Sequence, residues 1–130
     1  MAISSETKSQ IFESLKKLLL NHCNPLVISK NQHEVFEVIG NIETTYGSKK
    51  EIVPGMYFAS LAIRTDSVVF YFFPTYMHEA SFKPLAPNTW KCLKGKTCFH
   101  FKKLEQIDTQ EIDALMKMGI QSFKKQGWVK

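Results

Sequence analysis

Residues 57–73 read YFASLAIRTDSVVFYFF and predict two strands joined by a short turn at 65–67. In the first strand, every second residue from Tyr57 falls on one face and every second residue from Phe58 on the other. Residues 68–73 are apolar on both faces, which is typical of a central strand with both sides covered. We expect residues 74–94, which contain three prolines, to wrap the sheet and supply that cover.

Further strands are predicted on both sides of this pair. Residues 26–29 and 35–39 are rich in β-branched and aromatic side chains, and the polar residues between them favour a hairpin. Residues 40–54 are polar and fit either a long loop or an edge strand. Residues 87–93 predict a short helix, and residues 96–102 predict a last strand with Phe99 and Phe101 on the core side.

Two amphipathic helices are predicted outside the strands. The first begins at a capping serine, Ser4 or Ser5, and ends by Asn24-Pro25, because proline disfavours a helical residue before it. The second begins at Asp108, which opens an Asp-x-x-Glu capping pattern, and ends at Gly127.

The order helix, strands, helix predicts an α+β fold. We expect one antiparallel β-sheet with the N-terminal and C-terminal helices packed on one face, leaving the other face partly open. Residues 1–130 show no linker and no internal repeat, so they are interpreted as a single domain.

Composition indicates a folded protein of the cytoplasm. Hydrophobic residues make up 44% of the 130 residues, which suffices for a core without disulfides or a structural metal. The three cysteines are an odd number without a C-x-x-C pair, as expected of free thiols in a reducing compartment. The first residues lack the apolar segment of a secretion signal, and the longest apolar run, at 68–73, is too short to span a membrane.

The net charge of +5 comes entirely from residues 61–130. No acidic residue occurs between Glu79 and Glu105, a stretch that contains six lysines. This pattern indicates either a solvated basic surface, which we favour, or a patch for phosphate, nucleic acid or an acidic partner. Trp90 and Tyr76 are the rings available for stacking on nucleic acid, but the charge is modest for a nucleic-acid binder.

Cys98 and His100 are the sharpest local feature, because residues two apart on a strand point the same way. A thiol beside an imidazole is the minimal unit of a thiolate nucleophile, and Lys96 and Lys102 would favour the thiolate. The two backbone positions are about 6.6 Å apart, which is loose for direct proton transfer. We favour a packed cysteine beside a surface histidine, and we assign no catalytic residue. No spacing of histidine and cysteine matches a zinc motif, so no metal site or cofactor is expected.

Three segments carry a resemblance to a known family: residues 95–102 (GKTCFHFK), 70–77 (FYFFPTYM) and 123–128 (FKKQGW). Together they resemble a family of small bacterial proteins of unknown function that share a Gly-Lys-Ser-Cys-Phe-Asn-Phe strand and a Pro-x-Tyr turn, within the YdhG-like superfamily. The resemblance covers roughly residues 56–128. This chain departs from the pattern at Thr97 and His100, which argues further against a Cys–His catalytic pair.

The resemblance implies a helix–sheet–helix sandwich similar to frataxin, and some members of the superfamily are described as iron chaperones. Frataxin-like iron handling relies on an acidic first helix. The predicted first helix here carries only Glu6 and Glu13 against three lysines, so it lacks the carboxylate cluster that iron would need.

The sequence therefore favours a non-catalytic domain that binds a small ligand or a protein partner through its open sheet face and residues 74–94. The alternatives are an iron-chaperone-like protein, a Cys98-dependent enzyme or a weak nucleic-acid binder. The candidate ligand-binding residues are Tyr76, His78, Trp90, Lys96, Cys98, His100 and Lys102.

Overall fold

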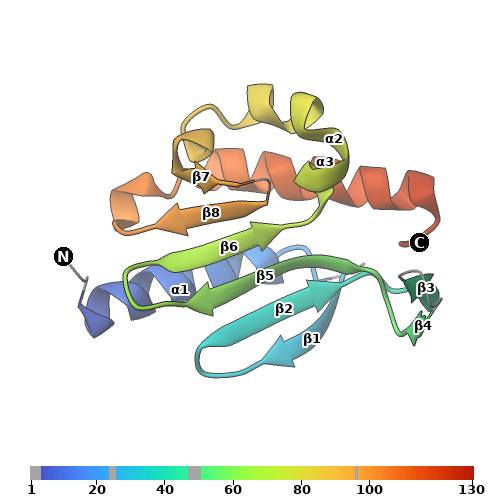
Figure 1. Cartoon of the computed structure of the whole chain (residues 1–130), viewed down its shortest axis with the longest axis horizontal. Helices are drawn as coiled ribbons and strands as arrows, with labels where there is room; N and C mark the ends of the chain where they lie inside the picture. The colour runs from blue at the N-terminus through green and yellow to red at the C-terminus, as the bar shows by residue number, and fades with distance from the viewer. Residues whose placement is uncertain (1–3, 24–25, 47–50, 96) are drawn as a thin grey trace.

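The computed structural model describes residues 4–23, 26–46, 51–95 and 97–130, and at 46 and 77–79 it describes the backbone alone. Six antiparallel strands form one sheet in the order β1-β2-β5-β6-β8-β7 (Figure 1). The strands are β1 (Val27–Asn31), β2 (Val35–Ile39), β5 (Tyr57–Ile63), β6 (Val68–Phe72), β7 (Leu93–Lys94) and β8 (Cys98–Phe101). As predicted, β6 lies inside the sheet, between β5 and β8.

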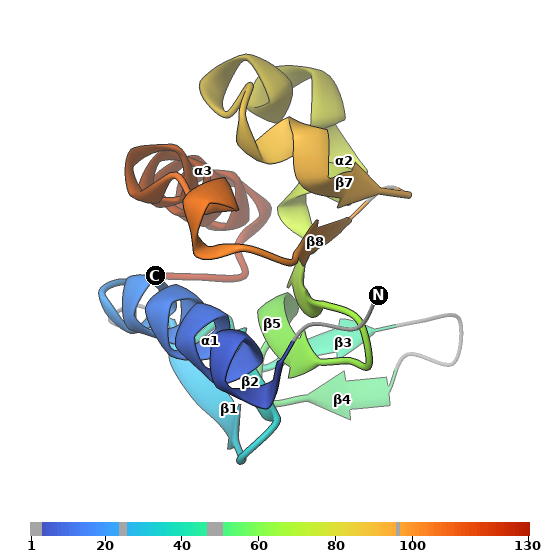
Figure 2. The same ribbon diagram turned by 90° about the vertical axis from the view of Figure 1, so that its left-hand side faces the viewer.

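Two long helices, α1 (Ser5–Leu20) and α3 (Thr109–Gln126), lie on one face of this sheet. Figure 1 shows them behind the strands, and Figure 2 shows that they leave the opposite face open. The predicted α+β class is therefore confirmed, with both helices on one side. No helix within the described ranges is long and apolar enough to cross a membrane.

The helix ends follow the predicted capping residues. The Ser4 side chain accepts a hydrogen bond from the Thr7 amide, and the Asp108 side chain accepts one from the Glu111 amide, each at 3.1 Å. The helix α3 ends at Gly127, whose φ of 81° lies in the left-handed region that glycine tolerates. The helix α1 ends at Leu20, before Asn24-Pro25, which lie outside the described residues.

The core between the sheet and the helices is built from aromatic rings. Eight phenylalanines are fully buried: Phe36, Phe58, Phe70, Phe72, Phe82, Phe99, Phe101 and Phe123. Burying one such side chain contributes about 1.5–3 kcal/mol. Gly119 lets α3 approach closely, because a Cβ there would lie 2.8 Å from Phe58 Cζ and 2.9 Å from Phe72 Cζ.

Two β-bulges flank β2. On the β1 side, Ile28 pairs with Val38 and Lys30 with Glu37, so that Ser29 is an extra residue. On the β5 side, the register shifts so that Phe58 is extra. This second bulge breaks the alternation predicted from Tyr57: Phe58 joins the buried face.

The described residues of the segment 40–54 form neither a plain loop nor an edge of the main sheet. They contain a separate antiparallel pair, β3 (Thr44–Tyr46) and β4 (Glu51–Val53). In Figure 2 this pair projects from the side of the sheet that faces away from α1 and α3. Gly55 follows β4 and passes so close to the Gly40 carbonyl that a side chain there would clash.

Residues 74–94 do not cover the open face, which corrects the prediction. They form α2 (Pro74–Phe82) and the 3-10 turns η1 (Lys83–Leu85) and η2 (Thr89–Cys92), beyond the β7 edge in Figure 1. The Phe82 ring packs edge-on against Phe72, which lies on the helix side, and the segment extends the helix layer. The contact between the Phe72 and Phe82 rings keeps both out of water, and this burial favours the helix side for the segment.

The buried carboxylate of Glu111 fixes this segment to α3. Its Oε1 accepts hydrogen bonds from the amide and the hydroxyl of Thr89, both at 2.8 Å, and its Oε2 accepts one from the Asn88 amide at 3.2 Å. The short helix predicted at 87–93 therefore exists as η2. Its Asn88 side chain makes no capping bond, since Glu111 binds the amides instead.

Candidate functional site

A row of polar side chains crosses the open face of the sheet. The strand registers place Glu37 beside Ser60, Ser60 beside Tyr71, and Tyr71 beside Cys98. The four belong to β2, β5, β6 and β8, so the row spans the inner strands and ends at β8. The strand neighbours of these residues, such as Phe36, Leu61, Phe70 and Phe99, point to the other face and are buried, because successive residues of a strand alternate between faces.

Three hydrogen bonds organise these groups. The Ser29 hydroxyl donates to Glu37 Oε2 at 2.7 Å, and the Tyr57 and Ser60 hydroxyls lie 2.5 Å apart. At the turn side of the sheet, Arg64 Nη2 donates to the Tyr71 hydroxyl at 3.2 Å. The open face therefore carries polar side chains in separate hydrogen-bonded pairs, beside an apolar row of Val35, Ala62 and Val69.

A pocket of about 280 Å³ lies at one end of this row, where the two bulges and the β3–β4 pair meet. We call it the Tyr57 pocket, and its lining residues are Ser29, Glu37, Ile39, Val53, Pro54, Gly55, Met56 and Tyr57. Five of the eight are apolar or glycine. Ligand pockets commonly have such a lining, with a few polar groups that converge on one side.

The bulges place the polar side chains of the Tyr57 pocket. Without the extra residue Phe58, Tyr57 would lie on the helix face with Ala59; with it, the Tyr57 hydroxyl meets Ser60. At the other bulge, the extra residue Ser29 keeps its hydroxyl on the Glu37 carboxylate although the register pairs Glu37 with Lys30. Bulges are common beside binding and active sites because they re-aim single side chains in this way.

The Tyr57 phenol is held in its neutral form. Burial raises the pKa of Tyr57 to about 12; the hydrogen bond with Ser60 opposes this shift, and the Glu37 carboxylate adds to it. The phenol therefore stays protonated at neutral pH, where it donates or accepts hydrogen bonds.

An aromatic row continues from the Tyr57 pocket towards α2. The Tyr57 ring stacks on Phe73 with a centroid distance of 6.2 Å, and Phe73 stacks on Tyr76 at 6.1 Å. Tyr76 is 61% exposed, so the row ends at the surface. Of the candidate residues from the sequence, Tyr76 is thus the one that this row connects to the pocket.

Cys98 and His100 lie half-buried on β8, opposite the buried Phe99 and Phe101, as their alternation predicts. The His100 ring is directed to Ser67: its Nδ1 lies 3.3 Å from the Ser67 hydroxyl. Burial lowers the pKa of His100, and the nearby Lys94 and Lys102 lower it further. The imidazole is therefore neutral at pH 7. The Cys98 sulfur has a different neighbour, the Thr97 hydroxyl, which lies 3.8 Å away.

The remaining candidates do not gather around Cys98. The Trp90 ring packs edge-on against Phe99 at 5.2 Å, on the helix side of the sheet. Lys102 is exposed just after β8, and its amide donates to Gln106 Oε1. Lys96 lies outside the described residues, as does the side chain of His78. The predicted set is thus divided between the two faces.

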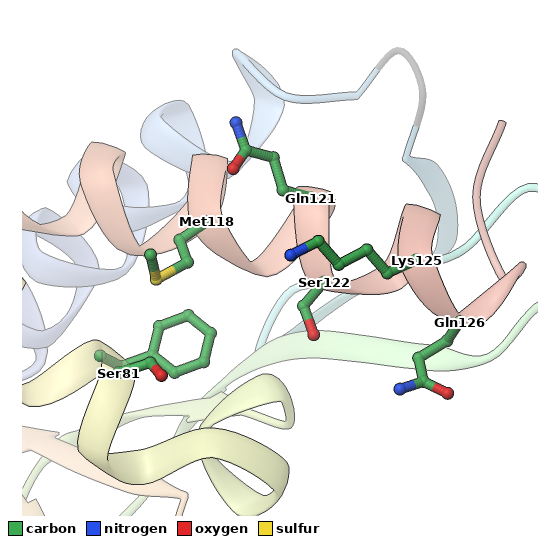
Figure 3. A pocket seen from close by; sticks show the side chains of 7 residues that line it. Ser81, Met118, Gln121, Ser122, Lys125 and Gln126 are labelled. Carbon is green, nitrogen blue, oxygen red and sulfur yellow. The ribbon is translucent and has the colours of Figure 1, made fainter.

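A second hollow, of about 380 Å³, lies between α2 and α3. Figure 3 shows Met118 directed from α3 towards the α2 side, whereas Gln121 points away. Its lining is Ser81, Phe82, Met118, Gln121, Ser122, Lys125 and Gln126. Because its polar groups do not converge on one point, it is a weaker candidate than the Tyr57 pocket.

Sequence reasoning did not identify Glu37, Tyr57 or Tyr71 as site residues. A signal existed for Glu37, which is the one charged residue within the apolar strand 35–39. No such signal existed for Tyr57, since its face depends on the bulge. Within the part of the chain that the structure describes, no three histidine, cysteine, aspartate or glutamate side chains are grouped so that they could hold a metal ion.

Comparison with known proteins gives no relative from which a function can be carried over. No protein family matches the chain, and neither the curated proteins nor the solved structures give a significant match.

Proposed function

We propose that the protein is a non-catalytic domain that binds a small molecule at its open sheet face, in the Tyr57 pocket. The observation that carries this proposal is the pair of β-bulges on either side of β2. Each bulge costs regular sheet pairing and lies at the same pocket: the extra Phe58 turns Tyr57 towards it, and the extra Ser29 is itself part of the lining. Irregularities that converge on one site are better explained by a ligand than by stability.

Binding fits these groups better than catalysis does. General acid–base catalysis works best with a group whose pKa lies near the operating pH, whereas the pKa of Tyr57 is raised to about 12. The Tyr57 hydroxyl is also engaged with Ser60. The pocket offers hydrogen bonds and apolar contacts, which orient a ligand without transforming it.

The test is a set of ¹H–¹⁵N spectra recorded with three probes that share an indole skeleton: tryptamine, tryptophol and indole-3-propionate. We expect at least one of them to cause saturable shift changes at the amides of Ser29, Glu37 and Tyr57. The Val53→Trp substitution fills the pocket and should abolish these changes. Its matched control is Ile52→Trp, which adds the same ring at a neighbouring position that is 71% exposed and outside the lining.

Two results would contradict the proposal: no saturable change with any of the three probes, or changes that persist in Val53→Trp. Native mass spectrometry with elemental analysis then addresses the alternatives from the sequence. Retained iron would favour a chaperone-like role, which the proposed relationship to the YdhG-like superfamily also suggests. Rapid alkylation of Cys98 by iodoacetamide would favour an enzyme, and salt-dependent binding of single strands would favour a nucleic-acid function.

A further inference from the structure

We propose, on the basis of the function proposed above, that the Tyr57 pocket selects a small organic cation: a protonated amine carried on an apolar or aromatic skeleton. The amine would lie at the Glu37 carboxylate and the skeleton against the apolar lining. This assigns a ligand class to the pocket and a specificity-determining role to Glu37.

Glu37 is the only charged residue that lines the Tyr57 pocket as the structure describes it. Its carboxylate is oriented by the Ser29 hydroxyl, which donates to Oε2 at 2.7 Å. That bond leaves acceptor positions on both carboxylate oxygens, because an ionised carboxylate can accept about four hydrogen bonds. A half-buried carboxylate with spare acceptors is suited to an ammonium donor.

No described lysine or arginine forms an ion pair with this carboxylate. The ion pairs among the described residues are those of Asp113 with His22 and with Lys117. Lys30 lies opposite Glu37 in the β1–β2 register, yet the two form no ion pair. The negative charge of Glu37 is therefore available to a ligand.

The rest of the lining suits the remainder of such a ligand. Ile39, Val53, Pro54 and Met56 offer apolar contacts, and Tyr57 adds an aromatic residue to the lining. The volume of about 280 Å³ lies just below the usual range of ligand pockets, which begins at about 300 Å³. A small amine fits this volume, whereas a drug-sized molecule would protrude.

The positive net charge of the chain distinguishes specific binding of a cation from non-specific attraction. At +5, the overall field of the protein attracts anions and repels cations. Non-specific binding would therefore rank indole-3-propionate above tryptamine. The opposite ranking requires a local group that attracts cations, and the Glu37→Gln variant shows whether that group is the Glu37 carboxylate.

The same three indole probes test the inference by their order of affinity. We expect tryptamine to bind about tenfold more tightly than tryptophol, because its ammonium adds a charge–charge attraction to the Glu37 carboxylate that a neutral hydroxyl lacks. Indole-3-propionate should bind most weakly. Glu37→Gln should lower the affinity for tryptamine about tenfold, to the level of tryptophol, while leaving tryptophol nearly unchanged.

Two further variants keep the test sharp. Glu34→Gln removes the same charge from the exposed β1–β2 turn, outside the pocket, and should leave tryptamine binding unchanged. Ser29→Ala leaves the Glu37 charge but removes the hydroxyl that orients it, so the affinity for tryptamine should fall a few-fold. This variant replaces Glu37→Gln in the test if Glu37→Gln does not fold. Equal affinity for tryptamine and tryptophol, or no loss in Glu37→Gln, would overturn the cation assignment while leaving the binding function intact. Failure of all three probes would overturn the binding function itself.

Discussion

The two faces of the sheet are built by different rules. The helix face is filled by phenylalanines that pack against one another and against α1 and α3, with rings such as Phe58 and Phe123 meeting edge-on at 4.8 Å. The open face carries hydroxyls, a carboxylate, a thiol and an imidazole that form separate hydrogen bonds. The comparison teaches that stability and binding capacity are divided between the two faces by the alternation of side chains, except at Tyr57 and Phe58, where a bulge decides the face.

Phe72 and Tyr71, neighbours on β6, should show the largest difference in stability between the two faces. Phe72→Ala should lower the free energy of unfolding by about 3–5 kcal/mol, because it leaves a cavity beside Phe58 and Phe82. Tyr71→Ala, on the open face, should cost only about 1 kcal/mol. Urea denaturation of both variants measures the difference. Similar losses in the two variants would show that the open face also belongs to the core.

Tyr57 gives a contrast of intermediate size. Above its ordinary pKa of about 10 the unfolded phenol loses its proton, whereas folded Tyr57 keeps it up to about pH 12. The unfolded state then binds fewer protons, so stability falls as pH rises from 10 to 12. Tyr57→Phe removes this loss and should gain about 1–2 kcal/mol relative to the wild type across that window. Denaturation of both proteins at pH 8, 10 and 11.5 measures this difference in the free energy of unfolding. A difference that does not change with pH would contradict the raised pKa of Tyr57.

The smallest expected effect lies at the rim of the helix layer, where α1 meets α3. The hydrogen bond from Lys117 is the main cause that lowers the pKa of Asp113; burial opposes it, and the His22 ring, 2.8 Å away, lowers the pKa further. A lowered pKa stabilises the folded state above the ordinary value, and this stabilisation is lost as pH falls through the folded value.

Asp113→Asn should therefore cost less than about 1 kcal/mol at pH 7, because solvent screens a side chain that is 38% exposed. At pH 2, where the carboxylate is protonated, it should cost nothing. Thermal unfolding at the two pH values measures this difference. Asp66→Asn, in the β5–β6 turn and without an ion pair among the described residues, is the matched control. A loss that is the same at both pH values would contradict the electrostatic explanation.

The sequence allowed the helix face to be predicted because local patterns determine it. The alternation around Phe99 and Phe101, the capping residues Ser4 and Asp108 and the stop at Gly127 all act within a few residues of chain. Local preference and final structure agree at these positions, so the α+β arrangement followed from the sequence.

The open face and its pocket could not be predicted in the same way. Phe58 occupies a bulge because its ring contacts Phe123, far away in the sequence, and this distant contact overrides the local alternation. The position of Tyr57 depends on that bulge. Residues 74–94 were placed on the wrong side for a related reason: their location is determined by Glu111 of α3, which binds Thr89 through its buried carboxylate.

The bulge at Ser29 has a further consequence, for the behaviour of the protein at high concentration. The strand β1 is an outer strand of the sheet, and Val27 and Ile28 are 45% and 41% exposed, so it resembles a template on which another chain could add a strand. The extra residue interrupts the regular spacing of amides and carbonyls after Ile28, and Lys30 places a charge directly after the bulge. Only a very short segment of β1 can then recruit another strand, so the bulge beside the Tyr57 pocket also protects the protein from aggregation.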